Sequence, residues 1–190
     1  MEEKIRKILE ENIRIKKIII KSLSKKIHQA INWINGAFNK GNKIILFGNG
    51  GSAADAEHIA TEFVSRFKKD RKPLPALSLT TNTSLITGHA NDYDFATIFS
   101  RQIEVFGKKG DIAIAISTSG NAANAIIGIK MAKKIGLKTI GLLGKGGGRL
   151  KDIVDLALIV PSDETPRVQE VHITIGHIIC ELVEEKQITR

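Results

Sequence analysis

Short apolar segments recur along this chain, and this pattern constrains the fold more than any other feature. Each segment is followed by small, polar residues and then by a stretch with helical periodicity. Residues 43–47 form one such segment and lead into Gly48-Asn49-Gly50-Gly51-Ser52. Residues 111–116 form another and lead into Ser117-Thr118-Ser119-Gly120-Asn121. Wholly apolar strands that alternate with helices are typical of a parallel sheet covered by helices on both faces.

The same pattern predicts five strands and the helices between them. The strands are expected at residues 43–47, 76–80, 111–116, 138–143 and 154–160. Helices are expected up to residue 38 and at residues 53–67, 122–135 and 166–186, with shorter helical pieces over residues 84–107 and a short turn or helix at residues 150–153. We therefore expect a single α/β domain over residues 1–190, with a doubly wound, five-stranded parallel sheet flanked by helices.

Residues 1–40 form an N-terminal helical extension that carries most of the positive charge. The formal net charge is +9, and residues 1–43 contain 11 lysines and arginines against 4 acidic residues. Because isoleucines at helical spacing separate these charges and no arginine–aromatic pattern accompanies them, we interpret them as a solvated helix face rather than a nucleic-acid surface. The apolar side of the extension is expected to pack either on a neighbouring subunit or on its own chain.

Composition also limits the compartment and the partners. Met1-Glu2-Glu3-Lys4 is not followed by an apolar segment, so we do not expect a signal peptide. The longest apolar runs, such as residues 18–20, are too short to span a bilayer. Cys180 is the single cysteine, which excludes an internal disulfide and a cysteine-clustered zinc site. We expect a cytoplasmic protein that binds neither membranes nor nucleic acid.

The two polar loops have the composition of phosphate-binding loops. Glycines let backbone N–H groups converge, serine and threonine add O–H donors, and the N-terminus of the next helix adds partial positive charge. Both loops are expected at the carboxyl edge of the sheet, where open α/β sheets bind ligands. The first loop matches neither the Walker pattern nor the GxGxxG pattern. Tight-turn and capping chemistry alone is the alternative interpretation.

Two predicted helices carry polar groups with the spacing of metal ligands. His58 and Glu62, four residues apart, share a face of their helix, and Gln169 and His177 lie about 80° apart around the axis of the last helix. Imidazole and carboxylate groups suit a zinc-like ion, with the glutamine oxygen as a weaker ligand. The spacings also fit a solvated pair at His58 and Glu62 and a core histidine at His177.

Taken together, these residues resemble the sugar isomerase (SIS) domain family and, within it, the phosphoheptose isomerases, over nearly the whole chain. The markers are residues 48–56, His58-x3-Glu62, Arg66-Phe67, Asn91-Asp92, residues 116–121 and Arg167-x-Gln169-Glu170-x-His172-x4-His177. The resemblance implies a flavodoxin-like sheet. It also implies an enzyme that converts sedoheptulose 7-phosphate to D-glycero-D-manno-heptose 7-phosphate through an enediol, the first step of nucleotide-activated heptose biosynthesis.

The resemblance further implies a role for each matching residue. Substrate-binding residues would be Asn49, Gly50, Gly51, Ser52, Glu62, Arg66, Asn91, Asp92, Ser117, Thr118, Ser119 and Gln169. One zinc ion per subunit would be held by His58, Glu62, Gln169 and His177, of which Glu62 and His177 would be the catalytic acid/base pair. The family is typically a homotetramer with active sites at subunit interfaces. Ala122 departs from the family pattern, which often has a phosphate-binding serine there.

Two other interpretations stay open. Some related SIS proteins are non-catalytic and bind the bacterial replication initiator, and others are phosphosugar isomerases for shorter sugars, such as hexulose phosphates. In the initiator-binding group the equivalents of Glu62 and His177 are replaced, and the hexulose-phosphate isomerases lack the two helix motifs. The intact residues of this chain therefore favour the heptose phosphate isomerase.

Overall fold

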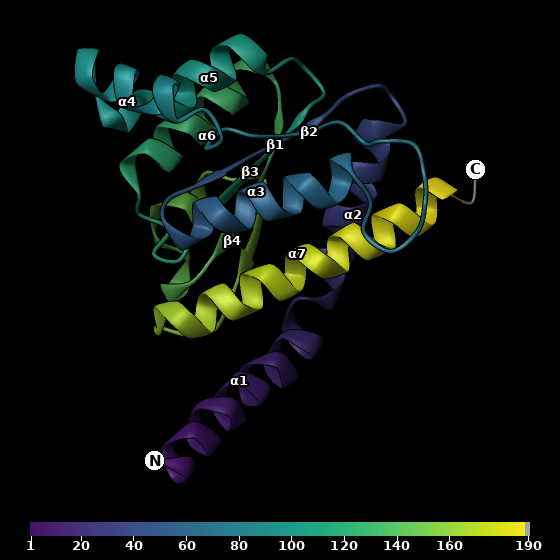
Figure 1. Cartoon of the computed structure of the whole chain (residues 1–190), viewed down its shortest axis with the longest axis vertical. Helices are drawn as coiled ribbons and strands as arrows, with labels where there is room; N and C mark the ends of the chain where they lie inside the picture. Colours follow the sequence, from purple (N-terminus) through teal and green to yellow (C-terminus); the bar gives the residue numbers. More distant parts are fainter. Residues whose placement is uncertain (189–190) are drawn as a thin grey trace.

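The five expected strands form one parallel sheet in the order β2-β1-β3-β4-β5 (Figure 1). The computed structural model describes residues 1–188. The strands are β1 (Ile44–Gly48), β2 (Ala76–Ser78), β3 (Ile112–Ser117), β4 (Lys138–Leu143) and β5 (Leu156–Ile159). This is the flavodoxin-like order, in which the direction of winding changes between β1 and β3. The expected doubly wound fold is confirmed, although β2 and β5 are shorter than the sequence pattern suggests.

Helices cover both faces of this sheet. They are α1 (Glu2–Ser22), α2 (Ser24–Phe38), α3 (Gly51–Val64), α4 (Thr83–Asp92), η1 (Phe95–Thr97), α5 (Ile98–Phe106), α6 (Ala123–Ile135), η2 (Lys145–Asp152) and α7 (Thr165–Ile188). One hydrophobic cluster joins the sheet to α2, α3 and α7, and a second joins it to α5 and α6, with apolar side chains of α4 packed against the second. The described helices therefore form one layer on each face (Figure 1).

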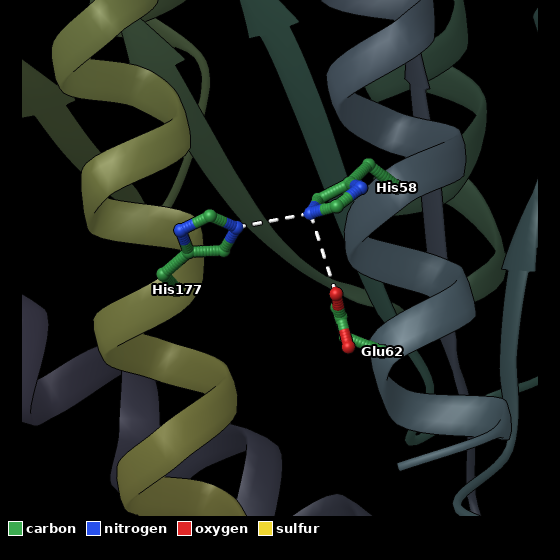
Figure 2. Close-up of side chains that lie close together, drawn as sticks. All are labelled: His58, Glu62 and His177. Atoms are coloured by element: carbon green, nitrogen blue, oxygen red, sulfur yellow. Dashed lines mark hydrogen bonds and ion pairs between the residues drawn. The ribbon is translucent and has the colours of Figure 1, made fainter. Parts of the chain in front are cut away.

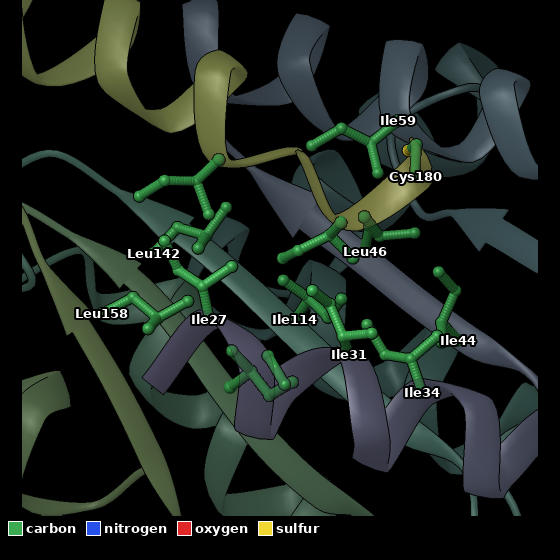
Figure 3. Close-up of a cluster of buried hydrophobic side chains, with 14 of the residues drawn as sticks. Ile27, Ile31, Ile34, Ile44, Leu46, Ile59, Ile114, Leu142, Leu158 and Cys180 are labelled. Atoms are coloured by element: carbon green, nitrogen blue, oxygen red, sulfur yellow. The ribbon is translucent and has the colours of Figure 1, made fainter. Parts of the chain in front are cut away.

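The two clusters follow from the alternation of side chains along buried strands. Ile44 and Leu46 of β1 point into the cluster with α2, α3 and α7, whereas Ile45 and Phe47 point into the other. Figure 3 shows the first cluster, in which isoleucines of α2 lie against β1, β3, β4 and β5. Full burial of each such side chain stabilises the fold by roughly 1.5–3 kcal/mol. Both faces of the sheet are thus anchored, which fixes the position of its carboxyl edge.

The N-terminal extension consists of two helices that meet at Leu23. α1 extends away from the sheet (Figure 1), and Ile15 and Ile19 near its end are buried. Ile5 and Leu9 near its start are 51% and 59% exposed, so only the second half of α1 packs fully on its own chain. Among residues 1–188, no helix has both the length and the apolar character needed to cross a membrane.

Candidate functional site

The first loop lies in close contact with the backbone of β3 and of the start of α3. A side chain at Gly48 would lie 2.7 Å from the carbonyl oxygen of Ser52 and 2.8 Å from that of Ile116, so only glycine allows α3 to begin directly above β1 and β3. Gly50 has a φ of +57°, a conformation that glycine adopts without strain. Ser52 is buried at the start of α3. The loop therefore delivers α3 to the carboxyl edge of the sheet.

Helices α3 and α7 lie side by side and in contact at two places along their lengths. At the start of α3, the side-chain amide of Gln169 packs directly on Gly51, where a methyl group would collide with it. Two turns further along, Ile59 packs on Gly176, where a side chain would lie 2.6 Å from the Ile59 Cδ1 atom. These two glycines allow the helices to approach closely, and the second contact places His58 opposite His177.

His58, Glu62 and His177 converge between these helices (Figure 2). The Nε2 atoms of the two histidines are 2.9 Å apart, and Nε2 of His58 is 3.3 Å from Oε1 of Glu62. The ring of Phe67 lies 5.4 Å from the ring of His177, centroid to centroid. The side chain of His58 is half exposed and that of Glu62 is 20% exposed. The predicted shared face of His58 and Glu62 is therefore observed, and His177 is partly exposed and faces His58 rather than being a core histidine.

The chemistry of this donor set fits a divalent cation. One ligand atom from each of the three residues lies within 4.8 Å of the others. Without a cation, two imidazole nitrogens at hydrogen-bond distance require that one carries a proton and the other accepts it. Two nitrogens bound tetrahedrally to zinc at 2.0–2.1 Å would lie about 3.3 Å apart, close to the observed separation. The three side chains can therefore hold a zinc-like ion after only a small adjustment.

Asp55 adds negative charge one turn before His58 on α3. Its Oδ2 atom is buried without a hydrogen-bond partner among the described residues. Burial raises the pKa of Asp55, and the charge of His58 acts in the opposite direction. A cation at the neighbouring cluster would favour the ionised form of this carboxyl group. Asp55 is not among the site residues predicted from the sequence.

The second loop is held by its own serines. The Oγ atom of Ser117 accepts a hydrogen bond from the backbone N–H of Gly120 at 3.1 Å, and that of Ser119 accepts one from Asn121 at 3.2 Å. A hydroxyl group that accepts a backbone N–H still has its own proton to donate. Gly120 has a φ of +65° and packs directly on the backbone of Gly147. The loop is thus held by its own hydrogen bonds, and its hydroxyl protons can still be donated to an anion.

An asparagine pair joins the two loops. The side-chain amides of Asn49 and Asn124 donate to each other's oxygens, both at 2.9 Å. Because residues 44–48 pair in register with residues 112–116, both loops leave the same edge of the sheet. Asn124 is buried, and its only sequence signal is an amide side chain at the start of an otherwise apolar helix. The two candidate phosphate loops are therefore neighbours at the carboxyl edge of the sheet, linked by this amide pair.

Comparison with known proteins identifies the family. The model of the SIS domain matches residues 9–144. The chain is 51% identical over 185 residues to a phosphoheptose isomerase from Aquifex aeolicus, covering 97% of both chains, and 52% identical over 180 residues to one from Clostridium acetobutylicum, covering 94% of this chain and 92% of that one. The chain belongs to the phosphoheptose isomerase family.

A solved phosphoheptose isomerase structure supports the same assignment. The structure from Neisseria gonorrhoeae superimposes on this one with a TM-score of 0.92 at 37% sequence identity, covering 97% of this chain and 98% of that one. The sequence resemblance to the SIS domain family and to its phosphoheptose isomerases is therefore confirmed.

Most residues predicted from the family motifs lie along α3 and α7 or at the carboxyl edge of the sheet. Gln169 lies on α7, and its side chain packs against Gly51 at the start of α3, on the same pair of helices as the histidine cluster. The loop residues Asn49, Gly50, Ser52, Ser117, Thr118 and Ser119 lie at the carboxyl edge of the sheet. Arg66 is exposed just after the end of α3.

Asn91 and Asp92 lie elsewhere. They are exposed at the end of α4, which packs on the other face of the sheet, far from α7 in Figure 1. The amide of Asn91 donates to Asp92 at 2.9 Å. A single described chain therefore does not bring these two residues to the histidine cluster, and their binding role stays a prediction.

Proposed function

We propose that this phosphoheptose isomerase family member converts sedoheptulose 7-phosphate to D-glycero-D-manno-heptose 7-phosphate, the first step in making nucleotide-activated heptose. The convergence of the Glu62 carboxylate and the His177 imidazole from two adjacent helices carries this proposal. The two hydroxyl-rich loops at the edge of the same sheet supply groups for a phosphate. The relatives at about 50% identity are named phosphoheptose isomerases, which supports the same activity here.

Glu62 and His177 can divide the proton transfers that the reaction needs. Glu62 takes the proton from C1 of the ketose while His177 donates a proton to O2, which gives the enediol. His177 then takes the proton from O1 and Glu62 returns its proton to C2, which gives the aldehyde at C1. Each group ends in the protonation state in which it began, so the cycle balances.

We further propose that His58, Glu62, Gln169 and His177 hold one zinc ion. When bound, such an ion polarises a carbonyl oxygen and makes a neighbouring hydroxyl group more acidic. Zinc coordination weakens both ligands as bases, so these assignments require that the second oxygen of Glu62 stays free for C1 and that the second ring nitrogen of His177 carries the transferred proton. The Asp55 carboxyl group beside His58 supports a cation at this position.

The loops and α4 would bind the rest of the substrate. Ser52, Ser117, Thr118 and Ser119 would hold the phosphate through hydroxyl and backbone donors. Asn49, Gly50, Gly51, Arg66, Asn91 and Asp92 would position the sugar. Because Asn91 and Asp92 lie apart from the cluster within one chain, this arrangement requires either a second copy or a movement of α4.

We propose that residues 1–190 form a single SIS domain in a cytoplasmic homotetramer, with residues 1–40 at the interface. The half-exposed apolar residues in the first part of α1, such as Ile5 and Leu9, support this interface. Such residues would be covered when α1 packs on a neighbouring copy. Light scattering or analytical ultracentrifugation of the purified protein measures the number of subunits directly, and a monomer would contradict the interface.

A product assay tests the function. The purified chain is incubated with sedoheptulose 7-phosphate, with and without a chelator, and the heptose phosphate is measured by NMR. We expect turnover that is lost with the chelator and restored by added zinc. Faster turnover of hexulose phosphates would reassign the substrate. Absence of turnover with zinc supplied, together with stable binding of the replication initiator, would refute the isomerase.

A further inference from the structure

The segment between α3 and β2 is tied to α7 by a buried ion pair. Nε of Arg71 lies 3.2 Å from Oε1 of Glu184, and the two side chains are 4% and 2% exposed. Glu184 lies two turns after His177 on α7, and Arg71 lies nine residues after Glu62. The pair is therefore anchored to the same two elements that carry the proposed acid and base, but neither residue reaches the histidine cluster itself.

Glu184 binds the backbone that leaves α3. Its carboxylate accepts hydrogen bonds from the N–H groups of Phe67, Lys68 and Lys69 at 2.9, 2.8 and 3.0 Å. Burial acts to raise the pKa of Glu184, but these three N–H groups and Arg71 outweigh it and hold the pKa below its ordinary value. A charged, fully hydrogen-bonded carboxylate therefore fixes three consecutive residues against α7.

Arg71 binds the end of α3. Its guanidinium donates to the carbonyl oxygens of Glu62 at 2.7 Å and Phe63 at 2.8 Å. The last carbonyls of a helix lack partners within the helix, and a cation beside them is also favoured by the helix dipole. Arg71 thus caps the turn of α3 that carries Glu62, and Glu184 holds Arg71 in place.

Phe67 extends the same tie to His177. Its N–H group is bound by Glu184, and its ring lies 5.4 Å from that of His177 with 37° between the planes. The aromatic contact restricts rotation of the His177 imidazole. The Glu184 carboxylate on α7 is therefore linked through Arg71 to the turn of α3 that carries Glu62. It is also linked, through the backbone of Phe67, to the ring that packs on His177.

We propose that Arg71 and Glu184 are positioning residues that hold Glu62 and His177 at their working separation, with Phe67 orienting the imidazole. This inference rests on the proposed function for its catalytic consequence. The tie itself concerns only the geometry of the three side chains. A purely stabilising role is the competing explanation, because loss of any buried ion pair destabilises a fold.

Asp111 provides a matched control for stability. It is fully buried directly before β3, where it accepts bonds from Nζ of Lys43 at 2.6 Å and from the backbone N–H groups of Lys43 and Lys108, both at 3.0 Å. Like Glu184, it is a buried carboxylate bound by one cation and by backbone donors. Unlike Glu184, it contacts neither helix of the candidate site through these bonds.

The experiment compares Glu184→Gln and Arg71→Lys with Asp111→Asn in the full-length protein. Melting temperature, kcat, KM and zinc affinity are measured, the last by competition with a chromophoric chelator. We expect Glu184→Gln and Asp111→Asn to lower the melting temperature comparably. Only Glu184→Gln should lower kcat, by roughly 10- to 100-fold with KM little changed, because misplacement of reacting groups acts mainly on turnover. Its zinc affinity should fall by about 10-fold, as for other residues that orient metal ligands.

Further readouts separate this proposal from the isomerase assignment. In the zinc-free protein, the side-chain NMR signals of His177 should shift in Glu184→Gln and Arg71→Lys but not in Asp111→Asn. If the wild-type protein does not turn over sedoheptulose 7-phosphate, the isomerase assignment fails. The zinc and NMR measurements still show whether Arg71 and Glu184 position the three side chains. If Glu184→Gln does not fold, Arg71→Lys, which keeps a cation beside Glu184, carries the test through kcat, zinc affinity and the His177 signals. Equal losses of kcat in Glu184→Gln and Asp111→Asn, or unchanged His177 signals, would overturn the proposal.

Discussion

Two groups of predicted site residues behave differently in this molecule. His58, Glu62 and His177 converge within one chain, because two adjacent helices present them at matching heights. Asn91 and Asp92 lie exposed at the end of α4, on the other face of the sheet. The helix group is therefore assembled by the fold of a single chain, and the α4 group is not.

This difference follows from how each group is held. The helix group is framed by buried contacts, namely Ile59 on Gly176 and the Arg71–Glu184 pair. α4 has no buried residue, so few contacts fix its end relative to the rest of the chain. We infer that chemistry is specified within each chain, whereas sugar positioning depends on α4 meeting the site from a neighbouring copy or by movement.

Loss of the proposed base or acid in the helix group should lower activity more than any other change. Glu62→Gln and His177→Ala should each lower kcat by roughly 10³- to 10⁴-fold, because each removes a group that must transfer protons. NMR of the heptose phosphate product measures the rate. Circular dichroism should show an unchanged fold, since Glu62 and His177 are partly exposed. Near-normal activity in either variant would show that the roles are assigned wrongly.

The α4 group should give a smaller effect with a different signature. Asp92→Ala should raise KM or lower kcat by about 10- to 100-fold, through loss of hydrogen bonds to the sugar. Asp92→Ala and Glu62→Gln chains are then unfolded together and refolded as mixed assemblies. If the two groups meet between copies, a random mixture should regain about a quarter of wild-type sites. If no activity returns, each site is built from one chain and α4 must move.

Much of the fold and part of the site could be predicted from the sequence. The strand pattern predicted the sheet, because buried parallel strands are continuous apolar runs, and the i, i+4 spacing predicted the His58–Glu62 face. The pairing of α3 with α7 could not be predicted from spacing, because it depends on Gly176 and on long-range packing. No motif in the sequence marks Arg71 or Glu184, and only their burial and their 3.2 Å separation reveal the ion pair.

His172, on the same helix as His177, should make the stability of the fold depend on pH. It is fully buried on α7, and burial lowers the pKa of its imidazole to about 4, with the backbone of Leu143 acting in the opposite direction. The unfolded imidazole, with a pKa near 6.5, takes up a proton before the folded one does. Stability from this group is therefore complete above about pH 6.5 and is lost progressively as the pH falls toward 4.

Urea unfolding measures this loss. Between pH 7 and pH 5 the free energy of unfolding should fall by about 2 kcal/mol from His172 alone, at fixed protein concentration. His172→Met, of similar size and without a titrating group, should remove that part of the pH dependence. An equal fall in the wild-type protein and in His172→Met would show that other groups cause the acid sensitivity.

Ala122 allows the smallest change, at the end of the second proposed phosphate loop. It precedes α6 with φ and ψ of −60° and 119°, an extended N-cap conformation, and it makes no side-chain cap. In Ala122→Ser, the new hydroxyl can cap α6, which would raise stability by about 0.5–2 kcal/mol, or donate to the phosphate, which would lower KM by roughly 2- to 10-fold. One hydroxyl oxygen can accept from the helix and still donate its proton, so both gains should appear together. A rise in melting temperature with unchanged KM would show that the existing serine and threonine hydroxyls already satisfy the phosphate, and that the alanine at this position costs the loop no binding.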